Sequence, residues 1–141
     1  MDKSLSPGAN PAEKPAVTLL LVDDDPMVRE IGRLMLVDLG YIVLTATDGT
    51  EAVDLFRVHN KEIALVFCDQ IMPRMDGWQT LAALHEINPA IPVIMASGLT
   101  QGSEKDTENQ VQPVGYLNKP YTMATLIQAL SQVFGHGERA A

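Results

Sequence analysis

The sequence LLLVDDDP at residues 19–26 joins a strongly apolar segment directly to a strongly acidic one. Four aliphatic residues in a row predict a buried strand, because the central strands of a parallel sheet are covered on both faces. Three aspartates follow without a spacer, and two such charges about 4 Å apart repel by ~1 kcal/mol even in water. We therefore expect the fold to bring positive charge close to these carboxylates.

Length and composition bound the class of protein. The chain has 141 residues, a normal size for one domain, and it is 46% hydrophobic and 20% charged, so it can bury a core. Its net charge of −8 argues against direct nucleic-acid binding and against anionic membranes. No apolar run approaches the ~20 residues of a membrane span. The single cysteine, Cys68, excludes an internal disulfide and fits a reducing compartment, so we expect a cytoplasmic protein.

The distribution of bulky residues predicts one folded domain with two polar ends. Residues 1–15, MDKSLSPGANPAEKP, are rich in proline and small residues and are typical of a flexible linker or arm. Residues 136–141 are similar and are expected to form a tail. The domain is therefore expected at 16–135.

Within that domain, strand-like and helix-like segments alternate. The predicted strands are 17–22, 41–46, 63–68, 91–96 and 114–117, and the predicted helices are 26–39, 49–59, 77–87 and 122–134. This alternation predicts an α/β fold, a doubly wound five-stranded parallel sheet with helices on both faces. The fold also needs a helix at 100–110, yet TQGSEKDTENQ lacks an apolar stripe, so we expect this helix to be short, displaced or partly melted.

Polar groups follow the predicted strands, where open sheets of this kind bind ligands. The first strand is followed by three aspartates and the third by Asp69. The fourth is followed by Ser97 and Gly98, and the fifth by Asn118 and Lys119. Carboxylates, a hydroxyl and an ammonium are thus expected to converge on one edge of the sheet.

Such a set has a definite chemistry. Carboxylates and other oxygen ligands suit Mg²⁺. A carboxylate can also act as a nucleophile and form an aspartyl-phosphate. Phosphoryl transfer requires cationic and hydrogen-bonding groups around the phosphoryl oxygens, which Mg²⁺, Lys119 and Ser97 would supply around Asp69.

Four motifs, LLLVDDDP, VFCDQIMPRMDG, PVIMASG and GYLNKPY, together resemble the receiver domain of two-component response regulators over residues 16–134. The resemblance implies a flavodoxin-like strand order of 2-1-3-4-5. It implies that Asp69 is the phosphoacceptor. It also implies a Mg²⁺ site with three direct protein ligands and a fourth residue that acts through water. Asp24, Asp69 and the main-chain carbonyl of Ile71 would bind the metal directly, and Asp23 would act mainly through water.

The same resemblance assigns the remaining site residues. Ser97, in place of the commoner threonine, and the Gly98 amide would bind the phosphoryl group, with Lys119 paired to it. Tyr116 matches the switch aromatic, with a half-buried strand residue as the alternative. Phosphorylation is expected to order the segment at 100–112, with a permanently irregular loop as the alternative. The bond before Pro120 is expected to be cis.

The resemblance also implies partners. A histidine kinase or a histidine phosphotransfer protein would donate the phosphoryl group, and the downstream effector is open. The segment INPAIPVIMASG resembles receivers of hybrid histidine kinases, while a stand-alone regulator fits nearly as well. Two other functions stay open: a Mg²⁺-dependent aspartyl-phosphate phosphatase, and a pseudo-receiver that binds partners without phosphorylation. No enzymatic activity is expected beyond self-catalysed phosphorylation and dephosphorylation of the aspartate.

Several residues near these motifs are expected to be structural. Asp25 before Pro26 and Asp76 before Gly77 are predicted helix caps. Cys68 is predicted to be a small core residue that faces away from Asp69. His85, in HEINP, is predicted to lie in a helix without a role as a phosphohistidine.

Overall fold

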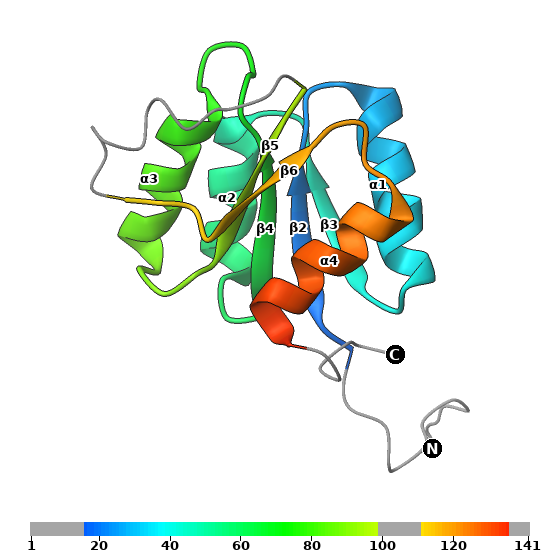
Figure 1. The fold of residues 1–141 in the computed structure, drawn as a ribbon. Coiled ribbons are helices and arrows are strands. Elements are labelled where there is room, and N and C mark those ends of the chain that lie inside the picture. Colours follow the sequence, from blue (N-terminus) through cyan, green and yellow to red (C-terminus); the bar gives the residue numbers. More distant parts are fainter. Residues whose placement is uncertain (1–15, 99–110, 136–141) are drawn as a thin grey trace.

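The computed structural model describes residues 16–98 and 111–135, which form a five-stranded sheet between two pairs of helices (Figure 1). The strands are β2 (Thr18–Val22), β3 (Ile42–Ala46), β4 (Ile63–Asp69), β5 (Val93–Ser97) and β6 (Gly115–Asn118). The helices are α1 (Pro26–Asp38), α2 (Gly49–His59), α3 (Gly77–Ile87) and α4 (Met123–Phe134).

The sheet is parallel throughout, and its order is β3-β2-β4-β5-β6. Numbered along the chain, this is the 2-1-3-4-5 order that the resemblance implies, which is confirmed. The strand order reverses between β2 and β4, where Val22 pairs with Cys68. The residues that follow these two strands therefore lie side by side at the carboxyl edge of the sheet.

Each face of the sheet has its own apolar core. Helices α2 and α3 cover one face, where Phe56 and Leu84 are fully buried. Helices α1 and α4 cover the other, where Leu36 and Leu126 are fully buried (Figure 1). Because the central strands are enclosed on both sides, their near-continuous apolar sequence follows directly.

The predicted elements agree with the observed ones to within two residues at each end. The predicted caps are also confirmed. The Asp25 side chain accepts hydrogen bonds from the backbone at the start of α1, and Asp76 forms a capping box with Gln79 at the start of α3. Cys68 is fully buried, as expected, and His85 lies in α3.

Three expectations fall outside the described residues: the arm at 1–15, the weak helix at 100–110 and the tail at 136–141. Across the part of the chain that is described, no helix combines the length and apolar character needed to cross a membrane.

Candidate functional site

The carboxyl ends of β2 and β4 position two buried aspartates. Asp23 directly follows β2, and its N–H donates to the Ala46 carbonyl at 3.1 Å. Asp69 is the last residue of β4, and the next N–H, that of Gln70, donates to the Ala96 carbonyl at 2.7 Å. These main-chain bonds fix both residues to neighbouring strands, so the positions of the carboxylates are set by the sheet itself.

Asp23, Asp24 and Asp69 form an acidic cluster. Each offers a carboxylate oxygen within 4.8 Å of the others. Asp23 is completely buried and Asp69 is 3% exposed, whereas Asp24 is exposed. The cluster therefore has two carboxylates inside the protein and one that faces solvent.

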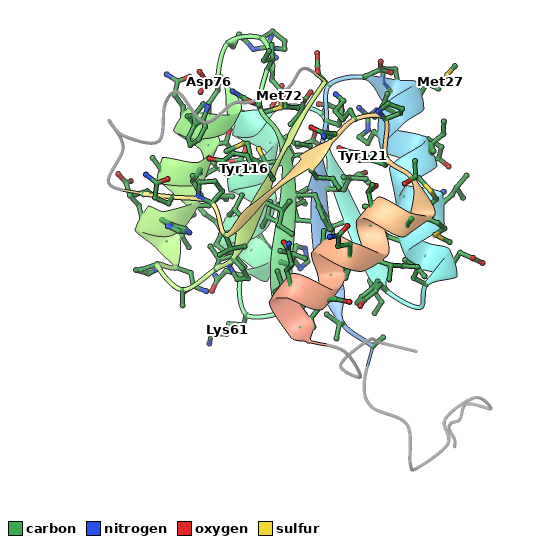
Figure 2. The ribbon with its side chains drawn as sticks, viewed as in Figure 1. Met27, Lys61, Met72, Asp76, Tyr116 and Tyr121 are labelled. Carbon is green, nitrogen blue, oxygen red and sulfur yellow. The ribbon has the colours of Figure 1, made fainter. Side chains whose placement is uncertain are left out.

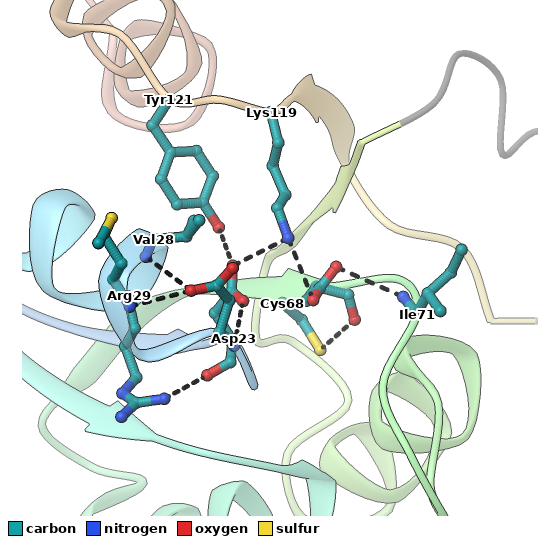
Figure 3. Close-up of polar contacts among 10 residues, drawn as sticks. Asp23, Val28, Arg29, Cys68, Ile71, Lys119 and Tyr121 are labelled. Atoms are coloured by element: carbon teal, nitrogen blue, oxygen red, sulfur yellow. Dashed lines mark hydrogen bonds and ion pairs between the residues drawn. The ribbon is translucent and has the colours of Figure 1, made fainter.

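Lys119 supplies the positive charge expected beside these carboxylates. Its Nζ lies 3.2 Å from Oδ2 of Asp23 and 3.2 Å from Oδ2 of Asp69 (Figure 3). The residue follows β6, its N–H donates to the Ser97 carbonyl at 2.9 Å, and its bond to Pro120 is cis, as predicted. An ammonium held between two carboxylates offsets their repulsion, which answers why the chain tolerates them together.

The cluster shifts the pKa of the central groups. Burial and the neighbouring Asp23 charge raise the pKa of Asp69 to about 7, although Lys119 acts in the opposite direction. Burial disfavours the charged form of Lys119, but Asp23 and Asp69 together outweigh it, so the pKa of Lys119 is raised. The ammonium is therefore charged at neutral pH, while Asp69 is poised between its two protonation states when no cation is bound.

Two side chains contact Asp23 that the sequence alone did not single out. The Tyr121 hydroxyl donates to Oδ2 of Asp23 at 3.2 Å, and Nη1 of Arg29 donates to the Asp23 carbonyl at 2.7 Å (Figure 3). Tyr121 was visible in the motif GYLNKPY, directly after Lys119 and Pro120. Nothing in the sequence indicates where its hydroxyl lies.

The loop after β4 closes over Asp69 from the side of α3. The Ile71 N–H lies 3.4 Å from Oδ1 of Asp69, which brings the Ile71 main chain beside the acidic cluster. Gly77 donates to the Gln70 carbonyl at 2.9 Å, and a Cβ at Gly77 would lie 2.5 Å from the Asp69 carbonyl oxygen. Only glycine permits this approach. In Figure 2, Met72 and Asp76 mark this end of the molecule, and Lys61 marks the opposite end.

The expected phosphoryl-binding residues lie at the same edge of the sheet. Ser97 ends β5, is 8% exposed and pairs with Asn118 of β6 in the sheet register. Among the described residues, no atom lies within 4 Å of where a Cβ at Gly98 would be. Tyr116 lies further back on β6 and is 44% exposed, so it does not belong to the acidic cluster.

The acidic cluster fits a hard divalent cation. Three carboxylates converge, one of them is accessible to solvent, and the Ile71 main chain runs alongside. Oxygen-only donors with room for water are what Mg²⁺ prefers. The fold and the site together define a doubly wound α/β protein with an acidic, lysine-paired cluster of side chains at its topological switch point.

The chain belongs to the response regulator receiver domain family, whose family model matches residues 19–131. A curated relative, the transcription factor SKN7 of Chaetomium thermophilum, is 34% identical over 124 residues, which are 88% of this chain and 16% of that protein. The chain spans less than half the length of several other curated relatives as well.

Solved structures agree with this assignment. The Vibrio cholerae chemotaxis protein CheY4 superposes with a TM-score of 0.76 and 29% identity, covering 84% of this chain and 99% of that one. The receiver domain of the Pseudomonas aeruginosa sensor histidine kinase PA1611, which holds a magnesium ion in its active site cleft, superposes with a TM-score of 0.74 and 27% identity. That alignment covers 86% of this chain and all of the other. The chain is therefore a receiver domain of the two-component type, which is not a classical enzyme family.

Proposed function

We propose that residues 16–135 form a phosphorylation-switched receiver domain in which Asp69 accepts a phosphoryl group from a partner phosphohistidine. The observation that carries this proposal is the Lys119 ammonium, 3.2 Å from the buried carboxylates of Asp69 and Asp23. A carboxylate oxygen of Asp69 attacks phosphorus, the P–N bond of the phosphohistidine breaks, and the imidazole leaves with the bonding electron pair. Attack of water on phosphorus later returns the free carboxylate and inorganic phosphate.

The surrounding groups would stabilise the charge that develops in this transfer. Lys119 would pair with the incoming phosphoryl oxygens, with the Ser97 hydroxyl and the Gly98 amide as further donors. The place of Ser97 at the end of β5, with Gly98 directly after it, supports these roles. Tyr116 is proposed to change its exposure when the site is phosphorylated.

Mg²⁺ would be held by Asp24, Asp69 and the Ile71 carbonyl, with Asp23 acting mainly through water. When bound, the ion would neutralise charge on the phosphoryl oxygens. The proximity of the three carboxylates supports this, as does the magnesium ion in the related receiver domain of PA1611.

The first helix offers a surface for the phosphohistidine-bearing partner, a histidine kinase or phosphotransfer protein. Met27, Ile31, Leu34 and Val37 lie on one face of α1, and each is between 45% and 70% exposed. Met27 marks the site end of α1 in Figure 2. Since α1 begins two residues after Asp24, a partner that covers this apolar face could present a histidine to Asp69.

The transfer chemistry can be tested without the partner. Phosphoramidate carries the same P–N bond as phosphohistidine, so the full chain with phosphoramidate and Mg²⁺ should gain the mass of one phosphoryl group. Excess chelator should prevent that gain. Sustained hydrolysis of p-nitrophenyl phosphate would instead favour the phosphatase alternative, and no labelling under any condition would favour a pseudo-receiver.

The partner surface needs a separate experiment. Leu34→Glu places a charge in the middle of the apolar face of α1 and should slow transfer from a phosphorylated histidine kinase or phosphotransfer protein. Labelling by phosphoramidate should stay unchanged, because the small donor does not need the helix. Val58→Glu, on the exposed side of α2, is the matched control. Equal transfer rates in the wild type and both variants would contradict this docking surface.

A further inference from the structure

The Tyr121 hydroxyl makes a buried hydrogen bond to Asp23 that is separate from the packing of the aromatic ring. Its side chain is 6% exposed, and its hydroxyl donates to Oδ2 of Asp23 at 3.2 Å. The same oxygen lies 3.2 Å from Nζ of Lys119 (Figure 3). One oxygen of a fully buried carboxylate therefore receives two donors.

The ring and the hydroxyl of Tyr121 make different contacts. The ring lies against α1, where a Cβ at Gly32 would be 3.0 Å from Cδ2 of Tyr121. Phenylalanine would keep that packing. Only the hydroxyl contacts Asp23, so Tyr121→Phe removes the hydrogen bond and keeps the packing of the ring.

The hydrogen-bonding capacity of Asp23 can be counted. An ionised carboxylate has about four acceptor sites, two on each oxygen. On Oδ2, Tyr121 and Lys119 fill both sites. On Oδ1, the Asp25 N–H fills one at 3.0 Å. Within residues 16–98 and 111–135 no second donor reaches Oδ1, which leaves one of its acceptor sites for a cation or for its bound water.

We propose that the Tyr121 hydroxyl is a positioning group that sets the cation preference of the acidic cluster. By filling Oδ2 together with Lys119, it leaves Asp23 only Oδ1 with which to hold a cation-bound water, and it opposes a direct contact of both carboxylate oxygens with the ion. Mg²⁺ takes six ligands, keeps several waters and accepts such contacts, whereas the larger Ca²⁺ takes six to eight oxygens and uses bidentate carboxylates. The hydroxyl therefore disfavours Ca²⁺ relative to Mg²⁺. This inference rests on the metal site of the proposed function.

The test compares the binding of two cations to the full chain. Dissociation constants for Mg²⁺ and Ca²⁺, each added alone, are measured by titration calorimetry for the wild type and for Tyr121→Phe. In the variant, the affinity for Ca²⁺ relative to Mg²⁺ should rise by about three- to tenfold, the range expected for one net hydrogen bond. Melting curves in chelator establish that the variant is folded at the titration temperature.

The matched control is Tyr41→Phe, which removes the same atom from a second buried tyrosine. Tyr41 directly precedes β3 and stacks on Phe134 with ring centroids 6.2 Å apart, at the far end of the sheet from Asp23. In Tyr41→Phe, the affinity for Ca²⁺ relative to Mg²⁺ should equal that of the wild type. An unchanged ratio in Tyr121→Phe, or an equal weakening of both cations, would overturn the role of the hydroxyl while leaving the metal site intact. A wild type that binds neither cation would overturn the metal site as well.

Discussion

Nζ of Lys119 and Oδ2 of Asp69 lie 3.2 Å apart, although fifty positions separate the two residues in the sequence. The contact exists because β4 and β6 both end at the same edge of the sheet, on either side of β5. Lys119 also contacts Asp23, so one ammonium holds together two carboxylates that would otherwise repel each other.

Removal of that ammonium should destabilise the protein. Lys119→Met leaves Asp23 and Asp69 without their cationic partner, and breaking such a pair costs about 3 kcal/mol. The free energy of unfolding in urea, measured in chelator at about pH 8, checks this expectation. Lys61→Met removes an exposed lysine at the opposite end of the molecule and should change little (Figure 2). Equal stability of the two variants would contradict the proposed pairing.

Removal of a repelling charge should have the opposite effect. Asp24→Asn should raise the stability of the cation-free protein by ~1 kcal/mol, because the side chain no longer repels Asp23 and Asp69. It should also reduce the extra stabilisation from added Mg²⁺, which follows from binding to the folded state. Melting curves with and without Mg²⁺ measure both effects. Asp38→Asn, an exposed aspartate at the end of α1, is the control. The same Mg²⁺ shift in Asp24→Asn as in the wild type would exclude Asp24 as a ligand.

The raised pKa of Asp69 predicts how stability depends on pH in chelator. The unfolded aspartate loses its proton near pH ~4, whereas the folded one keeps it until about pH 7. Between these values the folded state binds more protons, so this residue makes stability fall as pH rises. The loss of stability due to Asp69 should be complete above its pKa in the folded protein, and it should be absent below its pKa in the unfolded chain. Unfolding at a series of pH values should show a shallower decline for Asp69→Asn, and parallel curves for the two proteins would refute the shift.

The cap at Asp76 should contribute to stability without taking part in the chemistry. Asp76→Ala loses the side-chain bond to the Gln79 N–H at 2.9 Å and should destabilise the protein by ~1 kcal/mol. Asp76→Asn can still cap and should cost less. Both variants should be labelled by phosphoramidate. A complete loss of labelling in Asp76→Asn would mean that this carboxylate belongs to the site.

The sequence predicted the elements, and it predicted that Asp23, Asp69 and Lys119 converge at one edge of the sheet, for identifiable reasons. Runs such as LLLV and the helical spacing of apolar residues depend on local periodicity, which the chain carries directly. The carboxyl ends of parallel strands must share one edge, so the approach of Lys119 to Asp69 followed from the topology.

Other contacts depend on side-chain positions that local sequence does not encode. The Tyr121 hydroxyl reaches Asp23 across 98 positions, and Arg74, with a φ of 68°, pairs with Asp48 at 2.8 Å. Both contacts depend on how a loop is placed relative to the residues just before a helix in another part of the chain. Tyr121 was therefore interpreted only as part of a motif, and its contact with Asp23 became visible only in the structure.

The most direct test of the central claim is the site of phosphorylation. The full chain is treated with acetyl phosphate and Mg²⁺, the acyl phosphate is trapped by borohydride reduction, and the modified residue is located by peptide mass spectrometry. Our account predicts one phosphoryl group, on Asp69 alone, and no stable labelling of Asp69→Asn. Undiminished labelling of Asp69→Asn, or trapping at another aspartate in the wild type, would contradict it.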